Sequence, residues 1–153
     1  MNDHETVALQ LGREPAPFRV AARCPAGRPS VIENERRREM PTTFWITCPT
    51  LQAGISRVEA AGGVRQAQAE LGPEKIDETH AEHMRHYGTR VAGISDAGRV
   101  KCLHAFTALG LAGAIPNPVA RWTLDRLETT HLDPARCPGC VQKVWPKRQR
   151  PGG

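Results

Sequence analysis

The sequence predicts an α+β fold in which a small three-stranded antiparallel sheet is followed by, and packed against, four to five helices. Two observations lead to this fold class. Apolar residues alternate with other residues within 17–24 and 42–48, which is the period of half-buried strands. After Pro49 the apolar spacing changes to about 3.6 residues, the period of amphipathic helices. Strands that precede a run of helices are typical of α+β proteins, and we expect the helices to cover one face of the sheet.

The expected strands comprise residues 17–24, 30–34 and 42–48. In the first and third strands, Cys24 and Cys48 fall on inward-facing positions. Strands one and three of an up-down-up meander run in the same direction, so these two cysteines are expected at one end of the sheet.

Helices are expected over residues 49–61, 64–71, 74–88, 95–113 and 117–132. Pro49 suits a first helical position and leaves Cys48 at the N-cap, where the helix dipole favours thiolate. The helix over 95–113, capped by Ser95 or Asp96, is apolar nearly all round, so we expect it to be central and buried. Asn117 is expected to cap the last helix.

The five cysteines are the main candidates for chemistry, and three of them directly precede proline. The first twelve residues carry acids where a signal peptide carries bases, and the longest weakly polar run is too short to cross a bilayer. We therefore expect a soluble cytoplasmic protein that makes no contact with membranes. An odd number of cysteines in a reducing compartment favours thiols, metal ligands or a nucleophile over disulfides.

Spacing alone leaves the membership of a metal site open. Cys137 and Cys140 form a C-x-x-C pair, a spacing that supplies two ligands of a zinc site. Cys24 and Cys48 can complete this pair to a set of four cysteine ligands. The alternative is a set of ligands that includes Cys102. Two histidines of the 74–88 helix, His80 and His83, share its apolar face, where a core role and a ligand role are about equally expected. Cys102 and His104 lie about 200° apart on a regular helix, so they cannot easily bind the same ion. We expect one of them to contact a metal ligand instead of the metal.

Several stretches together resemble the bacterial, mainly actinobacterial, family called domain of unknown function 501. They are LGREP (11–15), RCPAGRP (23–29), PTTFWITCP (41–49), ISRVEAAG (55–62), RVKCLH (99–104) and NP (117–118). The resemblance covers roughly residues 9–128 and marks Cys24, Cys48, Cys102 and His104, with His80 marked more loosely. It implies no established activity or cofactor.

Two features of the chain depart from this resemblance, and one of them is that the RCPGC end and the basic tail lie outside the matched region. Family members often carry a longer segment rich in aspartate and glycine before RVKCLH, whereas this chain has only GTRVAGISDAG there. Members tend to be encoded near a septum formation initiator and an exopolyphosphatase-like protein. The resemblance therefore implies an unknown protein partner linked to cell division or to phosphate metabolism.

The positive charge is concentrated at the end of the chain. Residues 141–153 contain four bases and no acid, which leaves only +1 of the net +5 on the rest. We expect a single α+β domain over residues 1–136 and a tail over 137–153, formed by the C-x-x-C pair and a basic, disordered end. Such an end is most often a solvated extension, and weak contact with nucleic acid is the less expected alternative. Arg99 and Lys101, in the first turn of the expected central helix, are a candidate anion site.

Three functions are consistent with these features. The first is a non-catalytic accessory or interaction domain whose metal site, formed by Cys24, Cys48, Cys102 and His104 with His80 nearby, binds structural zinc. The second is a thiol-dependent enzyme with Cys48 or Cys102 as nucleophile and a histidine as base. The third is an interaction module whose thiols only fill the core. We favour a non-catalytic function, because no phosphate loop, nucleophile elbow or paired-carboxylate motif occurs.

Overall fold

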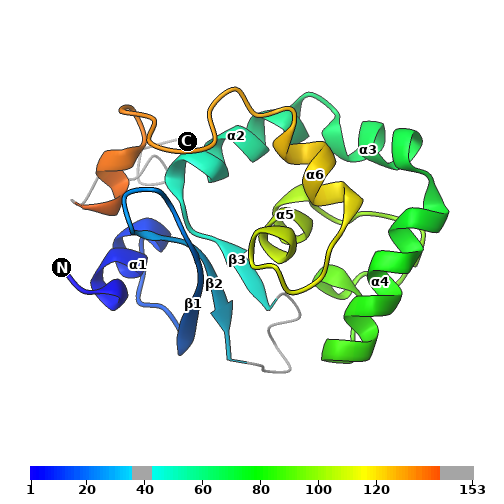
Figure 1. The fold of residues 1–153 in the computed structure, drawn as a ribbon, viewed down its shortest axis with the longest axis horizontal. Helices are drawn as coiled ribbons and strands as arrows, with labels where there is room; N and C mark the ends of the chain where they lie inside the picture. The colour runs from blue at the N-terminus through cyan, green and yellow to red at the C-terminus, as the bar shows by residue number, and fades with distance from the viewer. Residues whose placement is uncertain (36–42, 142–153) are drawn as a thin grey trace, which may run out of the picture.

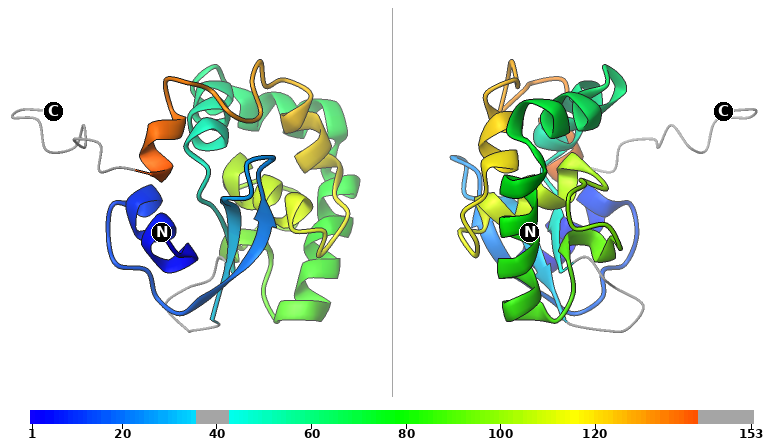
Figure 2. Two further views of the ribbon diagram at one scale, coloured as in Figure 1. Left: turned by 60° about the vertical axis from the view of Figure 1, so that its left-hand side comes forward. Right: turned by 90° about the vertical axis from the view of Figure 1, so that its right-hand side faces the viewer.

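The sheet lies between one short helix and a larger helical layer. The computed structural model describes residues 1–35 and 43–141. Helix α1 (Asp3–Leu11) covers one face of the sheet, and α5 (Leu103–Leu111) packs against β3 on the other face (Figure 1). The remaining helices surround α5: α2 (Pro49–Ala60), α3 (Gly63–Leu71), α4 (Pro73–Tyr87) and α6 (Pro118–Leu124) (Figure 2). The α+β class is confirmed.

The three strands form an antiparallel sheet in the order β1-β2-β3, as predicted. They are β1 (Phe18–Arg23), β2 (Pro29–Asn34) and β3 (Phe44–Ile46). Val31 of β2 pairs with Ile46 of β3, whereas the pairing of β1 with β2 is irregular between Val20 and Arg23. This irregularity interrupts the strict alternation of inward and outward side chains that we expected up to Cys24.

Both faces of the central strand β2 are buried, which corrects our expectation of helices on one face only. Val31 belongs to the main core, whose largest fully buried side chains include Phe106 and Leu103 of α5. Its neighbour Ile32 is also fully buried, and successive strand residues point to opposite faces. The second face is the one that α1 covers, and Val7 of α1 is fully buried as well.

Helix α1 was not among the elements we expected, although the sequence carries its start signal. The side chain of Asn2 accepts a hydrogen bond from the Glu5 backbone N–H, and the Glu5 carboxylate accepts one from the Asn2 N–H. This reciprocal pair is a capping box. Gly12 ends the helix in the left-handed region at φ 72°. The Asn-x-x-Glu spacing therefore marks a helix that we missed.

The helices from Pro49 to Tyr87 begin and end close to the predicted positions. Pro49 is the first residue of α2 and Cys48 is its N-cap. Gly62, at φ 90°, separates α2 from α3, and a side chain on Gly63 would come within 2.6 Å of the Val58 carbonyl oxygen. The two glycines thus let the chain turn sharply where a larger residue does not fit.

Helix α5 starts eight residues later than we expected. Ser95 and Asp96 do not cap it, because the Asp96 carboxylate instead accepts a hydrogen bond from Gly98 within the preceding loop. The N-cap is Cys102, whose sulfur accepts the Ala105 N–H at 3.4 Å. Cys102 is therefore outside the helix and His104 inside it. The angle of about 200° between them, which assumed one regular helix, does not apply.

The described chain ends in a packed turn. Cys137–Cys140 forms a short 3-10 helix, η2, that contacts α1 and α2, and Cys140 is buried. The packed part of the chain therefore extends four residues beyond the boundary we expected at residue 136. The basic stretch that we considered for weak contact with nucleic acid lies almost entirely outside the described residues.

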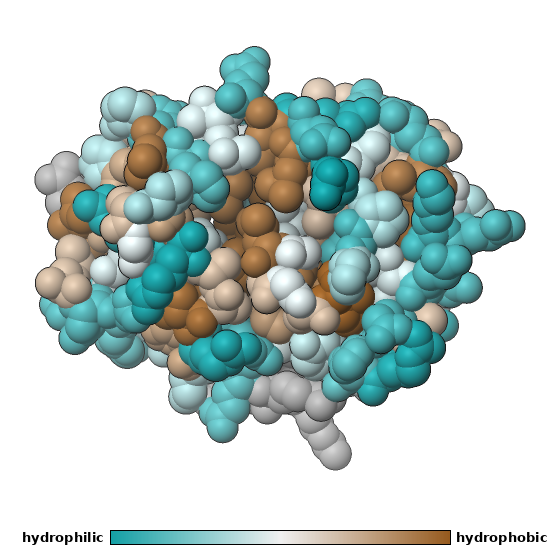
Figure 3. All heavy atoms as spheres, in the orientation of Figure 1, coloured by the Kyte–Doolittle hydropathy of each residue, from teal (hydrophilic) through white to brown (hydrophobic). Residues whose placement is uncertain are grey.

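The surface that faces the viewer in Figure 1 is mixed in character. Apolar residues reach the surface in the middle of this face and at several places on either side of it, with hydrophilic residues between and around them (Figure 3). In the described part of the chain, no helix combines the length and the apolar character that crossing a membrane requires.

Candidate functional site

The N-terminus of α2 is held beside the start of β2 by backbone hydrogen bonds. The N–H groups of Thr47 and Cys48 both donate to the Ser30 carbonyl oxygen, at 2.9 and 3.2 Å. Cys48 is 5% exposed, so its thiol lies within the packed part of the fold. The Cys-Pro pair thus joins the end of β3 to the beginning of α2.

Cys24 lies in the tight turn between β1 and β2. Its N–H donates to the Arg28 carbonyl at 2.9 Å, and its carbonyl accepts from Gly27, which has φ 82°. Because Arg23 pairs with Pro29, this turn stands next to Ser30 and so next to the N-terminus of α2. The first two Cys-Pro pairs therefore meet at one end of the sheet.

The C-x-x-C turn completes this arrangement from the other end of the chain. Cys137 Sγ lies 3.9 Å from Thr50 Oγ1, and the carboxamide of Gln10 donates both to Cys140 Sγ at 3.2 Å and to the Pro29 carbonyl at 2.7 Å. A side chain on Gly139 would come within 3.3 Å of the Pro49 ring. Figure 1 shows η2, the β1–β2 turn and the start of α2 gathered in the same part of the molecule.

We call Cys24, Cys48, Cys137 and Cys140 the four-cysteine cluster. All four are free thiols. Burial raises the pKa of Cys48 despite the opposing effect of the backbone amides of Leu51 and Thr50, and the nearby Cys140 and Cys24 raise it further. Burial of this side chain therefore opposes the thiolate that we expected at the N-cap. As they stand, no three histidine, cysteine or acidic side chains within residues 1–35 and 43–141 form a group that could hold a metal ion.

Cys102 and His104 belong to a different site, between α2 and α5. The Glu59 carboxylate accepts the Leu103 N–H at 2.7 Å and lies 3.1 Å from His104 Nδ1. On the other side of the ring, His104 Nε2 lies 3.3 Å from Ser56 Oγ and 3.4 Å from the Gln52 carbonyl oxygen. Ser56 is exposed, and the side chains of His104 and Glu59 are 22% and 25% exposed.

The length of α2 separates these two sites. Cys48 caps its N-terminus, whereas Glu59, which neighbours Cys102, lies in its last turn. Eleven residues of α-helix extend about 16 Å at a rise of about 1.5 Å per residue. The structure therefore divides the set that we expected to share one site.

His80 lies in neither site. Its Nε2 donates to the Arg99 carbonyl at 2.7 Å and its Nδ1 accepts the Val91 N–H at 3.1 Å, while the ring packs edge-on against Phe106. Burial lowers the pKa of this imidazole, and the hydrogen bond to Arg99 opposes that shift. Both ring nitrogens are occupied, so His80 has the contacts of a core histidine rather than those of a ligand.

The geometry on which we based the anion site at Arg99 and Lys101 is absent. Both residues precede α5 instead of forming its first turn, and Lys101 Nζ lies 3.5 Å from the Ala92 carbonyl oxygen. The Leu103 N–H donates to Glu59. The carboxylate of Glu59 therefore already lies at the actual N-terminus of α5.

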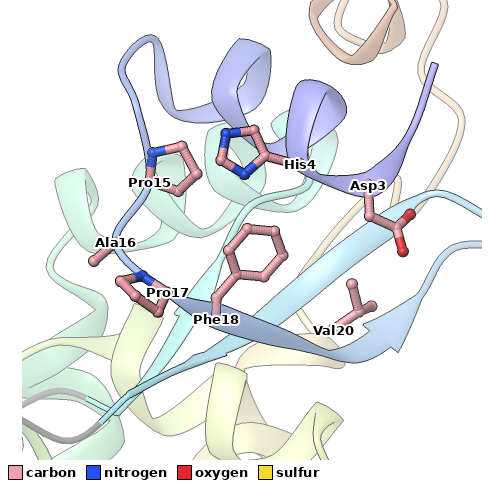
Figure 4. A pocket seen from close by; sticks show the side chains of 7 residues that line it. All are labelled: Asp3, His4, Pro15, Ala16, Pro17, Phe18 and Val20. Carbon is pink, nitrogen blue, oxygen red and sulfur yellow. The ribbon is translucent and has the colours of Figure 1, made fainter.

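A cleft of about 550 Å³ lies between α1 and β1 (Figure 4). Phe18 and Val20 project into it from the strand, His4 lies opposite them on the helix, and prolines 15 and 17 close one end. Because β1 is the outer strand of the sheet, this cleft adjoins a strand edge.

Comparison with known proteins identifies the family of this chain. The model of a family described as "Protein of unknown function (DUF501)" matches residues 20–88 and 69–125. The chain belongs to the DUF501 family. No curated protein and no solved structure matches it. The DUF501 match includes Cys24 and Cys48, and also the whole contact between Ser56, Glu59 and His104, whereas Cys137 and Cys140 lie beyond it.

Sequence reasoning missed two residues of the second site in this DUF501 chain. Ser56 and Glu59 lie on one face of α2, but nothing in their spacing connects them with His104, which follows more than forty residues later. One signal was available in the sequence. ISRVEAAG, which contains Ser56 and Glu59, and RVKCLH, which contains His104, are both among the stretches that resemble the family.

Proposed function

We propose that the chain is an accessory, protein-interaction domain whose four-cysteine cluster binds a structural zinc ion in the reducing cytoplasm of a bacterium. One observation carries this proposal. Three segments that are far apart in the sequence bring Cys24, Cys48 and the Cys137–Cys140 turn to the N-terminus of α2. Small domains use such convergence of thiols from separate loops to hold a tetrahedral ion.

The surroundings of the cluster suit a zinc–thiolate centre. Thiolates are the preferred ligands of structural zinc, and C-x-x-C supplies two of them from one turn. The Gln10 carboxamide donates to Cys140 Sγ, and such donors orient and stabilise metal-bound sulfurs. Zinc–sulfur bonds are about 2.3 Å long, so binding draws the four side chains inward from their present positions. Bound metal also favours thiolates and so offsets the raised pKa of the buried thiols.

The alternative of a thiol-dependent enzyme has less support. Cys102 is half-buried, and its sulfur is engaged as the N-cap of α5. Burial raises the pKa of Cys102 in spite of the opposing Ala105 amide, and the neighbouring Glu59 raises it further. A nucleophilic cysteine needs the opposite shift.

For the protein partner we propose the cleft between α1 and β1 as the docking surface. An extended segment can add to the outer edge of β1 and place an apolar side chain beside Phe18. A partner linked to cell division or to phosphate metabolism remains part of this proposal. Binding by an identified partner should be lost in Phe18→Glu and retained in His86→Asn, whose site lies on exposed α4 surface. Equal binding of the partner by both variants would show that the cleft is not the docking surface.

The zinc proposal is tested by metal analysis of protein purified under reducing conditions without added chelator. We expect one zinc ion per chain, released by a mercurial reagent, and a cobalt-substituted form with the visible absorption of a tetrahedral thiolate site. Cys24→Ser and Cys140→Ser should lower zinc content strongly. Cys102→Ser is the matched control, because serine is itself a favoured N-cap residue. Metal-free wild-type protein, or zinc that is lost only from the Cys102 variant, would refute the four-cysteine assignment.

A further inference from the structure

Ser56, His104 and Glu59 form a nucleophile–base–acid array on the surface between α2 and α5. The ring of His104 has Glu59 Oε1 at 3.1 Å from Nδ1 and Ser56 Oγ at 3.3 Å from Nε2. The other Glu59 oxygen accepts the Leu103 N–H, so the carboxylate is fixed in position. An acid that orients a histidine, which in turn meets a hydroxyl, is the arrangement that activates serine nucleophiles.

The hydrogen-bond partners determine the tautomer of a neutral His104. An ionised Glu59 only accepts hydrogen bonds, so Nδ1 must carry the ring proton and Nε2 must be the acceptor. The Gln52 carbonyl, 3.4 Å from Nε2, has no proton to donate. The Ser56 hydroxyl is therefore the donor to Nε2, and the ring nitrogen is placed to take its proton.

We propose that Ser56 is a base-assisted nucleophile that accepts acyl groups from activated esters and thioesters. Its Oγ forms a bond to the acyl carbon while the hydroxyl proton moves to His104 Nε2. The bond from the carbonyl carbon to the leaving group then breaks, and the leaving oxygen or sulfur departs as an anion or takes the proton from His104. Glu59 stabilises the imidazolium that exists between these steps. Water, activated by the same ring, afterwards hydrolyses the Ser56 ester to a carboxylic acid and restores the hydroxyl. This step is slower than acylation, because the serine alkoxide is a poorer leaving group than an activated phenolate or thiolate, so the acyl-serine accumulates.

The surroundings of the array define the substrate class. The N–H groups of Leu103 and Ala105, at the nearby start of α5, already donate to Glu59 and to Cys102. They are not available to stabilise an oxyanion, which is a large contribution to the cleavage of amides. Ser56 is also exposed rather than enclosed. The array therefore suits acyl groups that carry a good leaving group, and it does not suit peptides.

The proposal is tested with p-nitrophenyl acetate and the full-length protein. After incubation, a thiol reductant at neutral pH removes acetyl groups from cysteines and leaves serine esters intact. Intact mass and peptide mapping should then show one acetyl group on Ser56. His104→Asn should slow its formation about 100-fold, the usual contribution of a general base. Glu59→Gln should slow it less, because the amide still orients the ring but does not stabilise its charge.

Matched variants separate this chemistry from general surface reactivity. Ser95→Ala removes another exposed serine and His86→Asn another exposed histidine, so neither should change acetylation at residue 56. Ser56 that stays unmodified, or that is acetylated at the same rate in folded His104→Asn, would overturn the proposal. The zinc content of the protein affects neither outcome, so this test is independent of the zinc proposal.

Discussion

At the scale of single residues, His80 shows how a buried polar side chain acquires a pH dependence. His80 is 1% exposed, and both of its ring nitrogens have backbone partners. Protonation would require Nδ1 to give up its hydrogen bond from the Val91 N–H and would place a charge in the core. These contacts explain both the lowered pKa and the structural role of the residue.

The first prediction concerns acid destabilisation through His80. The folded-state pKa lies below the ordinary value of 6.5, so the unfolded chain binds a proton at a higher pH than the folded protein does. The stabilising contribution is complete above pH 6.5 and declines as the pH falls from there towards the folded-state pKa. Urea unfolding at several pH values should show this decline. His80→Asn should make the decline shallower, and it should lower the free energy of unfolding by about 1–3 kcal/mol at neutral pH because buried backbone groups lose partners.

The comparison for His80 is His86, which is exposed on the same helix and pairs with Glu82. His86→Asn should leave both the free energy of unfolding near neutral pH and its decline with acid close to those of wild type. If His80→Asn kept the full acid dependence, another group would have to be responsible for it.

The residues of the candidate sites differed in how far the sequence predicted them. Cys24 and Cys48 were placed correctly because strand direction alone brings their ends together. We expected Cys102 and His104 beside those thiols, but the late start of α5 and the full length of α2 separate them from the other thiols. Ser56 was missed because a serine on an exposed helix face carries no signal of a distant partner.

At the scale of elements, local sequence signals predicted most helix boundaries. The start of α5 was predicted wrongly because a polar residue in the preceding loop resembled a helix cap. Proline is the first residue of α2 and of α4, and a glycine follows the end of each of α2, α3 and α4. The error at α5 arose because Asp96 satisfies a turn of its own, while the actual cap is a cysteine, which helix-start rules do not favour. The strand period likewise predicted the sheet, but not the irregular pairing within β1.

The second prediction concerns the close contact between α5 and α6. A side chain on Gly110 would place its Cβ 2.4 Å from the Ala120 Cβ. Gly110→Ala should therefore lower the free energy of unfolding by about 1–3 kcal/mol, because overpacking forces the two helices apart. This loss should exceed the gain of about 1 kcal/mol that alanine brings to a helix interior. Thermal and urea unfolding measure the difference.

Gly54 of α2 provides the matched control for Gly110. There an added Cβ meets mainly the end of the Leu127 side chain, at 3.1 Å, and that side chain can shift. Gly54→Ala should be neutral or stabilise the protein by up to about 1 kcal/mol through helix propensity. Equal effects of the two substitutions would show that the α5–α6 contact is looser than the structure indicates.

At the scale of the whole molecule, α2 connects the two sites that we propose. Its N-terminus holds the four-cysteine cluster, and its remaining turns supply Ser56 and Glu59 to the contact with α5. The cluster joins the β1–β2 turn to both ends of the described chain, since α1 reaches it through Gln10. A metal ion there would add a direct connection between these segments, which hydrogen bonds and packing already bring together.

The third prediction tests this long-range connection with two truncated chains. A chain that ends at Val141 keeps Cys137, Cys140 and all their described contacts, whereas one that ends at Arg136 loses them. With zinc present, the shorter chain should have a free energy of unfolding lower by more than about 3 kcal/mol, because structural zinc contributes directly to folding. With a chelator present, the difference should shrink to about 1–2 kcal/mol, the contribution expected from one small packed turn. If the difference between the chains did not change with the chelator, packing alone would hold the turn in place, and the cluster would not be a metal site.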